Sequence, residues 1–338
     1  MSTTATLPTV TLGTDGPVVG VQGLGCMGIS EFYGDSDLTE SRATLDHALE
    51  LGVTLFDTAD VYGSGHNEEF LADFVRANRE NLVIATKFGI VRKADNPTFR
   101  GFDNSPGYIR ASVDASLRRL GIDTIDLYYM HRRDPAVPIE DTVGTLAELV
   151  AAGKVRALGL SEVTGDELRA AHAVHPIAAL QSEWSLFSRD VERTAVPAAA
   201  ELGVAFVPYS PLGRGFLTGA FRTAKDLSDK DFRQFQPRFT GDNAEHNADL
   251  LAPLAAIAAA HGITQAQAAL AWVHARAEVH GLPVVPIPGT RKRGRLAENV
   301  AAATVQLTAE ELATLEPIAG QVAGNRYADM SFTSAGRE

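Results

Sequence analysis

One segment of the chain holds the strand–helix–strand pattern that decides the fold. The apolar run LVIAT occupies residues 82–86, the amphipathic stretch PGYIRASVDASLRRL occupies 106–120, and a second apolar run, IDLYY, occupies 125–129. Ser105 before the middle stretch and Gly121 after it are typical helix start and stop residues. Continuous apolar runs on either side of a helix indicate parallel strands that are covered on both faces.

The same alternation repeats along most of the chain. Further predicted strands lie at 23–25, 53–56, 155–160, 177–180, 204–207 and 284–287. Further predicted helices lie at 41–51, 66–78, 139–152, 164–174, 191–202 and 296–303. Eight strands that alternate with helices predict an α/β fold, a (β/α)8 TIM barrel that forms a single domain over residues 1–338 with its core at about 9–318.

Three segments fall outside this repeat. Residues 8–20 predict an N-terminal β-hairpin that caps the bottom of the barrel. Residues 213–247 are rich in glycine, phenylalanine and charge but show little periodicity, which predicts a long loop at the C-terminal face. The tail at 320–338 has no periodic pattern, so neither a helix nor a strand is predicted there.

A doubly wound dinucleotide-binding fold is the alternative to a barrel. Residues 23–28 read GLGCMG and match the G-x-G-x-x-G string of that fold. However, residues 29–34 are not a helix start, and no acidic residue closes a following strand in the expected way. The match is therefore weak, and the barrel is favoured.

The charge balance and the single cysteine exclude several classes of protein. The 338 residues carry 30 basic and 42 acidic side chains, a net charge of −12, which disfavours a general nucleic-acid binder. Cys26 alone permits neither an internal disulfide nor a cysteine-cluster metal site. We find no secretory signal and no apolar stretch long enough to span a bilayer, so we expect a cytoplasmic protein that binds no membrane. A basic run at 291–295 stands out in this acidic chain and indicates a local anionic partner.

Polar side chains follow three consecutive predicted strands where each strand ends. Asp57 and Tyr62 follow the second strand, Lys87 ends the third, and His131 ends the fourth. Since the carboxyl ends of barrel strands share one mouth, we expect these side chains to meet. The pKa of a free tyrosine is about 10, which is too high for fast proton delivery at neutral pH, and a nearby ammonium lowers it. A carboxylate would hold the lysine and a histidine would orient a carbonyl, so the four residues form a proton-donating device.

The chain resembles an aldo-keto reductase. The matching motifs, in the order of that family, are LFDTADVYG at 55–63, ATK at 85–87, DLYYMH at 126–131, GKVRALGLS at 153–161, PYSPLGRG at 208–215 and IPGT at 287–290. Each motif is moderately specific, and their order along the chain makes the set strongly specific. The resemblance implies that Asp57, Tyr62, Lys87 and His131 form a catalytic tetrad that works with a nicotinamide cofactor and without a metal.

The resemblance also implies the contacts of that cofactor. Ser161 and Gln181 would hold the carboxamide, and Tyr209 would stack on the nicotinamide ring. Arg291 and Arg295 would take the 2′-phosphate, which favours NADPH over NADH because a guanidinium pairs with phosphate through two hydrogen bonds. The other residues expected in the cofactor site are Ser210, Leu212, Gly213, Gly289, Thr290, Glu298 and Asn299.

The chain departs from the family pattern in two places. Glu162 stands where many relatives have asparagine after the fifth strand, and an acid there would reorganise the carboxamide contact. Arg132 and Arg133 follow the tetrad histidine where steroid-handling members often have an aromatic residue, which predicts a more polar pocket. Candidate pocket walls are Tyr33, Phe88 and Trp184, and the last two are equally compatible with packing in the core.

These features favour an NADPH-dependent enzyme that reduces small aldehydes or ketones to alcohols. A second hypothesis is a cofactor-holding regulatory subunit, like the potassium-channel β subunits that resemble the same family. A third is a barrel aldolase with Lys87 as a Schiff-base residue, which leaves the basic run without a role. Turnover of NADPH with a carbonyl compound would distinguish the first hypothesis from the other two.

Overall fold

Seven parallel strands form one curved sheet in the part of the chain that the structure describes. The computed structural model describes residues 7–34, 36–93, 96–229 and 231–338. The strands lie side by side in chain order, and their bounds are β3 Leu24–Gly25, β4 Leu55–Asp57, β5 Val83–Phe88, β8 Ile125–Met130, β9 Val155–Ser161, β10 Ala179–Glu183 and β11 Ala205–Tyr209. Parallel neighbours in chain order are what a barrel requires, and with the flanking helices they confirm the predicted TIM-barrel fold.

The eighth strand position is present but irregular. Residues 283–289 lie between β11 and β3 and pair with them through single bridges, Phe206 with Val284 and Gly25 with Gly289. Three of these seven residues are prolines, which accept hydrogen bonds but have no N–H group to donate. The ring of strands is therefore closed without a continuous eighth ladder.

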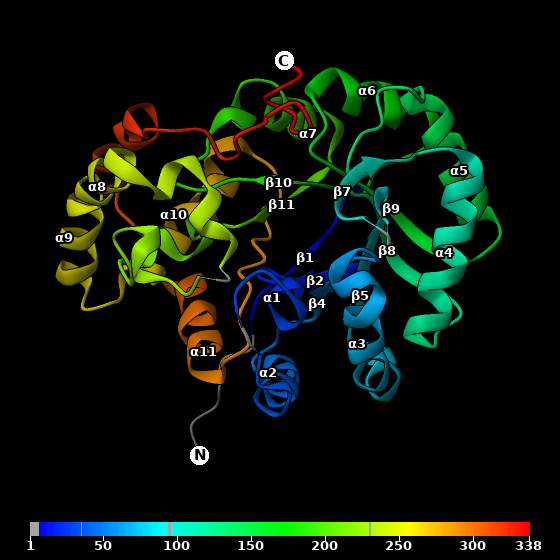
Figure 1. The fold of residues 1–338 in the computed structure, drawn as a ribbon, viewed down its shortest axis with the longest axis horizontal. Coiled ribbons are helices and arrows are strands. Elements are labelled where there is room, and N and C mark those ends of the chain that lie inside the picture. The colour runs from blue at the N-terminus through cyan, green and yellow to red at the C-terminus, as the bar shows by residue number, and fades with distance from the viewer. Residues whose placement is uncertain (1–6, 35, 94–95, 230) are drawn as a thin grey trace.

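Helices cover the outside of the barrel, as Figure 1 shows. The surrounding helices are α2 Leu38–Glu50, α3 His66–Ala77, α4 Pro106–Leu120, α5 Ile139–Ala151, α6 Gly165–Val174, α7 Ala195–Leu202, α10 Gln265–His280 and α11 Arg293–Ala301. α4 has its predicted bounds because both end signals operate. Ser105 accepts a hydrogen bond from the N–H of Tyr108, and Gly121 adopts a left-handed φ of 66° that ends the helix.

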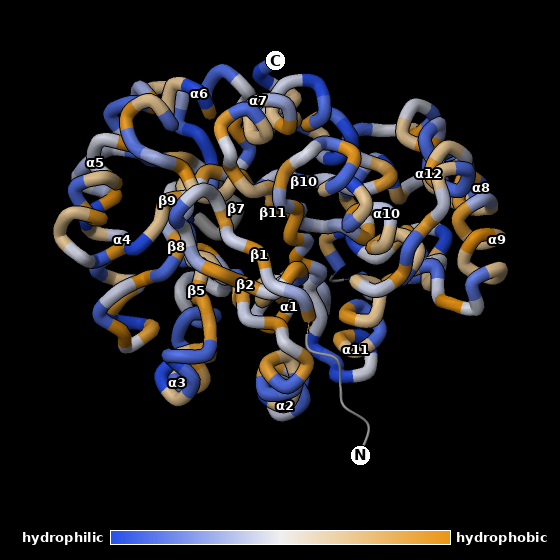
Figure 2. Tube along the Cα trace, turned by 180° about the vertical axis from the view of Figure 1, so that it is seen from behind, coloured by the Kyte–Doolittle hydropathy of each residue, from blue (hydrophilic) through white to orange (hydrophobic). Residues whose placement is uncertain are grey.

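The predicted hairpin closes the barrel at the amino ends of the strands. Strands β1 (Thr9–Thr11) and β2 (Val18–Gly20) pair antiparallel. Leu12 and Val19 pack into a buried apolar cluster with residues that line the barrel interior, including Leu55 and Leu127. In Figure 2 the central strands carry mostly hydrophobic colours, whereas the outer helices alternate between hydrophobic and hydrophilic colours along their length. The lower barrel is thus an apolar core, and polar chemistry is left to the carboxyl ends.

The segments beyond the repeat gather at the mouth of the barrel. The hairpin of β6 (Ile90–Lys93) and β7 (Asn96–Phe102) follows β5 and was not predicted, and the remaining helices are α1 Met27–Ser30, α8 Gly241–Asp249, α9 Ala252–His261 and α12 Ala309–Leu315. The segment 213–247 contains short 3₁₀ turns and most of α8, so it is more ordered than the predicted loop. The tail at 320–338 runs from α12 towards α7, where Glu338 pairs with Arg193 at 3.1 Å (Figure 1).

Candidate active site

Asp57 and Lys87 form a buried ion pair at the carboxyl ends of neighbouring strands. The pairing of β4 with β5 sets Asp57 beside Ala85, and Lys87 follows two residues later on the same face. The Lys87 ammonium pairs with the Asp57 carboxylate and also donates to the backbone oxygen of Thr58 at 2.8 Å. The Lys87 side chain has no exposed surface, so its charge depends on these partners.

The other predicted tetrad residues surround this pair. The Lys87 nitrogen lies 5.2 Å from the centre of the Tyr62 ring. The rings of Tyr62 and His131 meet edge to face with their centres 5.8 Å apart. From the opposite side, Gln181 Nε2 donates to the second oxygen of Asp57 at 2.8 Å. The structure therefore brings the four residues together, with Gln181 as a fifth member that fixes Asp57.

Burial controls the protonation of this group. It raises the pKa of the Tyr62 phenol well above its ordinary value, and the Asp57 carboxylate raises it further. Burial lowers the pKa of Lys87 although Asp57 opposes that change. Burial, with Arg132 and Lys87, also holds the pKa of His131 well below its ordinary value, so its imidazole is neutral. The expected lowering of the tyrosine pKa by lysine is therefore outweighed, and Tyr62 keeps its proton at neutral pH.

A large cavity opens at this end of the barrel. Its volume is about 910 Å³. The residues assigned from the sequence that line it are Tyr33, Asp57, Tyr62, His131, Gln181, Tyr209, Ser210, Leu212, Gly289, Thr290, Arg291, Arg295, Glu298 and Asn299. These residues come from all around the mouth, so one space reaches from the tetrad to the basic run.

Five assigned residues, Lys87, Phe88, Ser161, Trp184 and Gly213, do not line this cavity. Phe88 is fully buried and its ring packs against Tyr128, with centres 5.1 Å apart. Trp184 is also fully buried and packs edge to face on Phe206. Both point into the layer between strands and helices, so their assignment to the pocket wall is corrected to the core. Lys87, Ser161 and Gly213 are buried as well; the hydroxyl of Ser161 accepts a hydrogen bond from Arg132 at 3.2 Å.

The basic run divides its side chains between two tasks. Arg291 donates to the backbone oxygens of Gly28, Tyr33 and Gly34 at 2.6–3.1 Å and so fixes the segment after α1. Arg295 is exposed at the edge of the cavity, and the described residues offer its side chain no hydrogen-bond or ion-pair partner. Because Arg291 is already engaged, Arg295 is the stronger candidate for binding a phosphate.

The residues of the cavity fit a dinucleotide cofactor. Amide and hydroxyl groups of Gln181 and Ser210 lie at the tetrad end, and the Tyr209 ring faces the same space. The Arg295 guanidinium, which has no partner among the described residues, lies at the far end. Gly25 lines the cavity, and a Cβ atom there would lie 2.9 Å from the backbone oxygen of Ile287, so the close approach of the two backbones at this point of the wall favours glycine. This donor set can orient a carboxamide, a ring and a phosphate.

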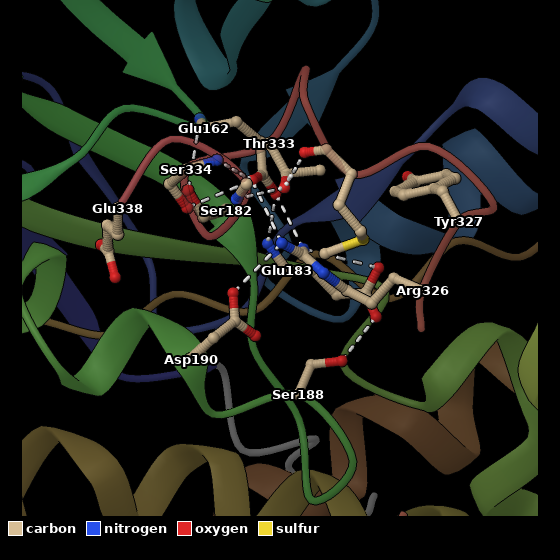
Figure 3. Close-up of polar contacts among 12 residues, drawn as sticks. Glu162, Ser182, Glu183, Ser188, Asp190, Arg326, Tyr327, Thr333, Ser334 and Glu338 are labelled. Atoms are coloured by element: carbon tan, nitrogen blue, oxygen red, sulfur yellow. Dashed lines mark hydrogen bonds and ion pairs between the residues drawn. The ribbon is translucent and has the colours of Figure 1, made fainter. Parts of the chain in front are cut away.

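Glu162 forms a second buried charge cluster beside the cavity. Its carboxylate accepts from Tyr209 Oη at 2.6 Å, from Arg326 at 3.0 and 3.3 Å, and from the backbone and side chain of Ser334 at 3.1 and 3.3 Å. Burial opposes the charge, but Arg326 and Arg132 lower the pKa of Glu162 to about 2. Figure 3 shows tail residues Arg326 and Ser334 meeting residues from the barrel strands at this point.

Sequence reasoning missed this contribution of the tail. Tyr327 and Phe332 line the cavity, and Tyr327 accepts a hydrogen bond from Arg214 at 2.5 Å. The tail has no helical or strand periodicity, so its sequence pattern predicts no place for it in the fold. The composition of the tail does indicate packing against the barrel, because an arginine, a tyrosine and a phenylalanine lie within seven residues.

Neither a metal site nor a membrane-spanning helix is found among the described residues. In the described part of the chain, no group of three or more histidine, cysteine, aspartate or glutamate side chains is arranged to hold a metal ion. Within the same residues, every helix is too short or too polar to cross a membrane.

The fold and the site define a TIM barrel with a buried Asp–Lys pair behind a tyrosine and a histidine. A family model described as the aldo/keto reductase family matches residues 23–319, and the chain belongs to this family. The family uses NADP(H), and the protein is accordingly an NAD(P)-dependent oxidoreductase that acts on small-molecule carbonyl compounds.

Solved structures agree with this assignment. A glycerol dehydrogenase from Gluconobacter oxydans is 29% identical, with a TM-score of 0.80 over 94% of this chain and 96% of its own. A holo aldo-keto reductase from Bacillus halodurans is 26% identical, with a TM-score of 0.74 over 96% and 100%. An aldo/keto reductase from Klebsiella pneumoniae in complex with NADP and acetate is 25% identical, with a TM-score of 0.69 over 94% and 99%.

Proposed function

We propose that this protein reduces aldehydes or ketones to alcohols with NADPH and that Tyr62 supplies the proton. The observation that carries the proposal is the shared cavity. Tyr62 and His131 line one end, Arg295 lines the other, and the Lys87–Asp57 pair is buried against Tyr62. A proton donor and a phosphate-binding group in one cavity are what hydride transfer to a carbonyl requires.

The residues act on the carbonyl oxygen. When bound, the nicotinamide cofactor supplies a hydride to the carbonyl carbon. Tyr62 holds its proton because burial raises its pKa, and it gives the proton to the oxygen as negative charge develops there. The ammonium of Lys87, 5.2 Å from the ring centre, then stabilises the tyrosinate. The neutral imidazole of His131 donates a hydrogen bond that orients the carbonyl.

The position of Arg295 at the far end of the cavity supports a preference for NADPH. The 2′-phosphate distinguishes NADPH from NADH, and a guanidinium binds phosphate through two parallel hydrogen bonds. Arg295 is the arginine of the basic run that lines the cavity without a partner among the described residues. It also lies in the first turn of α11, where free backbone N–H groups favour anions.

The geometry opposes a Schiff-base function for Lys87. Its ammonium has no exposed surface and does not line the cavity, and it is held by a carboxylate. A Schiff-base lysine must be reached by the substrate carbonyl and must lose its proton to attack. A regulatory subunit that binds the cofactor without turnover does not need Tyr62 as a proton donor. Substitution of Tyr62 therefore distinguishes the regulatory hypothesis from the enzyme hypothesis.

The test is NADPH oxidation in the presence of activated aromatic aldehydes. We expect turnover with the wild-type protein and a fall of about 10²- to 10⁴-fold in kcat for Tyr62→Phe, with NADPH affinity unchanged. Tyr108→Phe is the matched control, because Tyr108 lies on α4 away from the cavity and should keep full activity. Tight NADPH binding without turnover on any carbonyl would favour the regulatory subunit. Equal kcat/KM with NADH would remove the cofactor preference.

A further inference from the structure

We propose that the natural substrate is an aldehyde or ketone that carries a carboxylate and that Arg132 binds this group. The inference rests on the proposed reduction of carbonyl compounds and adds a substrate class. Arg132 directly follows the tetrad residue His131 and lines the same cavity. A carboxylate held there would lie close to the carbonyl that Tyr62 and His131 act on.

Arg291 and Arg295 line the cavity at the basic run, and of the other four lining arginines only Arg132 has no carboxylate partner among the described residues. Three of the lining arginines have a carboxylate partner: Arg92 pairs with Glu31 at 2.8 Å, Arg214 with Glu183 at 3.2 Å and Arg233 with Asp231 at 2.6 Å. These pairs neutralise most of the wall around the substrate end. A positive charge that remains unneutralised there therefore needs an explanation of its own.

Arg132 is buried without such a partner. Its side chain donates from one nitrogen, Nη1, to the backbone oxygen of His131 at 2.7 Å and to the Ser161 hydroxyl at 3.2 Å, and both acceptors are uncharged. Among the described residues it forms no ion pair with a carboxylate, and the hydrogen bonds it donates both come from Nη1, so its other two nitrogens donate none. The residue is only 7% exposed, and a buried guanidinium without a counter-ion is costly. A bound anion would relieve that cost.

Glu162 does not fill this role. Arg326, Tyr209 and Ser334 already occupy both oxygens of its carboxylate. Burial lowers the pKa of the Arg132 guanidinium, but the neighbouring Tyr209 and Glu162 outweigh this and raise that pKa, so the guanidinium stays charged. Arg132 therefore keeps a whole positive charge and free N–H groups at the cavity.

Two aromatic rings hold the guanidinium in place. The central carbon of the Arg132 guanidinium lies 5.9 Å from the centre of the Tyr209 ring and 5.8 Å from that of the Phe332 ring. Arginine stacks on aromatic faces, and a fixed guanidinium loses little freedom when it binds a carboxylate through two hydrogen bonds. Phe332 belongs to the tail, so the tail helps to shape this subsite.

The experiment compares substrates that differ only in charge. We expect the wild-type protein to reduce para-formylbenzoate at least about tenfold more efficiently, as kcat/KM, than its neutral methyl ester, and succinate semialdehyde more efficiently than butanal. In Arg132→Met the ratio of acid to ester should fall to about one, and Arg132→Lys should keep part of it. The matched control is Arg133→Met. Arg133 is the next residue, but it donates to the backbone oxygens of Asp134 and Val137 and does not line the cavity, so its loss should leave the ratio unchanged.

Binding of unreactive probes separates this inference from the proposed function. Calorimetry would measure the affinities of benzoate and benzamide for the NADP⁺-loaded protein and for the protein alone. We expect benzoate to bind at least about tenfold more tightly, and Arg132→Met to remove the difference.

Benzoate binding through Arg132 without any carbonyl turnover would support the anion subsite and contradict the reductase proposal. Equal reduction of acid and ester by the wild-type protein would overturn the inference. So would an Arg132→Met protein that loses NADPH affinity but keeps the acid preference, since Arg132 would then serve the cofactor.

Discussion

Two buried carboxylates at the mouth of the barrel, Asp57 and Glu162, obtain their partners in different ways. The partners of Asp57 are Lys87 on β5 and Gln181 on β10, so its whole environment is made of strand ends. The main partner of Glu162 is Arg326, which lies 164 residues further along the chain, in the C-terminal tail. The first cluster is built by the barrel alone, whereas the second joins the barrel to a segment outside it.

This difference assigns different roles to the two clusters. Closure of the barrel places the Asp57 group, and that group lies directly against Tyr62 and His131. The Glu162 group holds the tail, whose Tyr327 and Phe332 line the cavity. We therefore expect damage to the first cluster to stop the chemistry, and damage to the second to loosen a wall of the pocket while the chemistry continues.

The largest effect is expected from Lys87→Met. The substitution leaves the Asp57 carboxylate buried with Gln181 as its remaining side-chain partner and removes the cation that we propose stabilises the tyrosinate of Tyr62. We expect kcat for aldehyde reduction to fall by about 10³-fold. Loss of one partner of a buried pair should also cost about 3–5 kcal/mol of unfolding free energy, measured by urea denaturation.

Lys154→Met is the matched control for that change. Lys154 pairs with Asp114 at 2.6 Å, but both side chains are partly exposed, and such surface pairs contribute about 0–1 kcal/mol. Activity and stability should both stay near wild type. A Lys87→Met protein that keeps normal kcat would show that the Asp57 cluster is structural, and the contrast with Glu162 would disappear.

A smaller effect is expected from Arg326→Met. The guanidinium of Arg326 bridges Glu162 and Asp190, at 3.1 Å from the latter, so its loss should release the tail from the barrel. We expect KM for an aldehyde to rise by about tenfold while kcat changes by less than about threefold. The reason is that the tail lines the pocket but does not contact the Asp57–Lys87 pair. Chymotrypsin should cut after Tyr327 and Phe332 faster than in the wild-type protein.

Arg222→Met provides the comparison for the tail variant. Arg222 pairs with Asp249 on the surface, with both side chains largely exposed, and its loss should change neither KM nor proteolysis. If Arg326→Met lowers kcat as strongly as Lys87→Met does, the tail belongs to the catalytic machinery and the division between the two clusters fails.

The two clusters also differ in how far the sequence predicts them. The barrel could be predicted because continuous apolar runs and helix signals are local, as at 106–120, where Ser105 and Gly121 set both ends. The grouping of Asp57 with Lys87, Tyr62 and His131 could then be predicted, because the strand ends of a barrel converge. Strand bounds were predicted to within a few residues, and the prolines of 283–289 explain why the eighth strand is irregular.

The Glu162 cluster could not be predicted because its contacts are long-range and have no period. Glu162 departs from the family pattern, but its partner Arg326 lies in a tail without helical or strand spacing. The assignment of Phe88 and Trp184 to the pocket wall is wrong for a related reason. A residue that ends a strand points either into the mouth or into the outer layer, and one residue of uncertainty in the strand bounds reverses that choice.

The smallest effect of the series is expected in the pH dependence of the free energy of unfolding, which tests the charge of Glu162. The pKa of Glu162 is lowered from 4.5 to about 2, so its charge stabilises the fold above the unfolded pKa, and that contribution is lost as the pH falls through the folded value. The stability difference between wild type and Glu162→Gln should therefore shrink by about 2 kcal/mol between pH 6 and pH 3, as measured by urea unfolding.

Glu183 and Asp190 face the same cluster but are present in both proteins, so their titration largely cancels. Glu201→Gln, which removes a surface partner of Arg169, should show no such trend. A difference that stays constant from pH 6 to pH 3 would mean that Arg326 and Tyr209 do not hold Glu162 in its charged form, and the tail would then need another anchor.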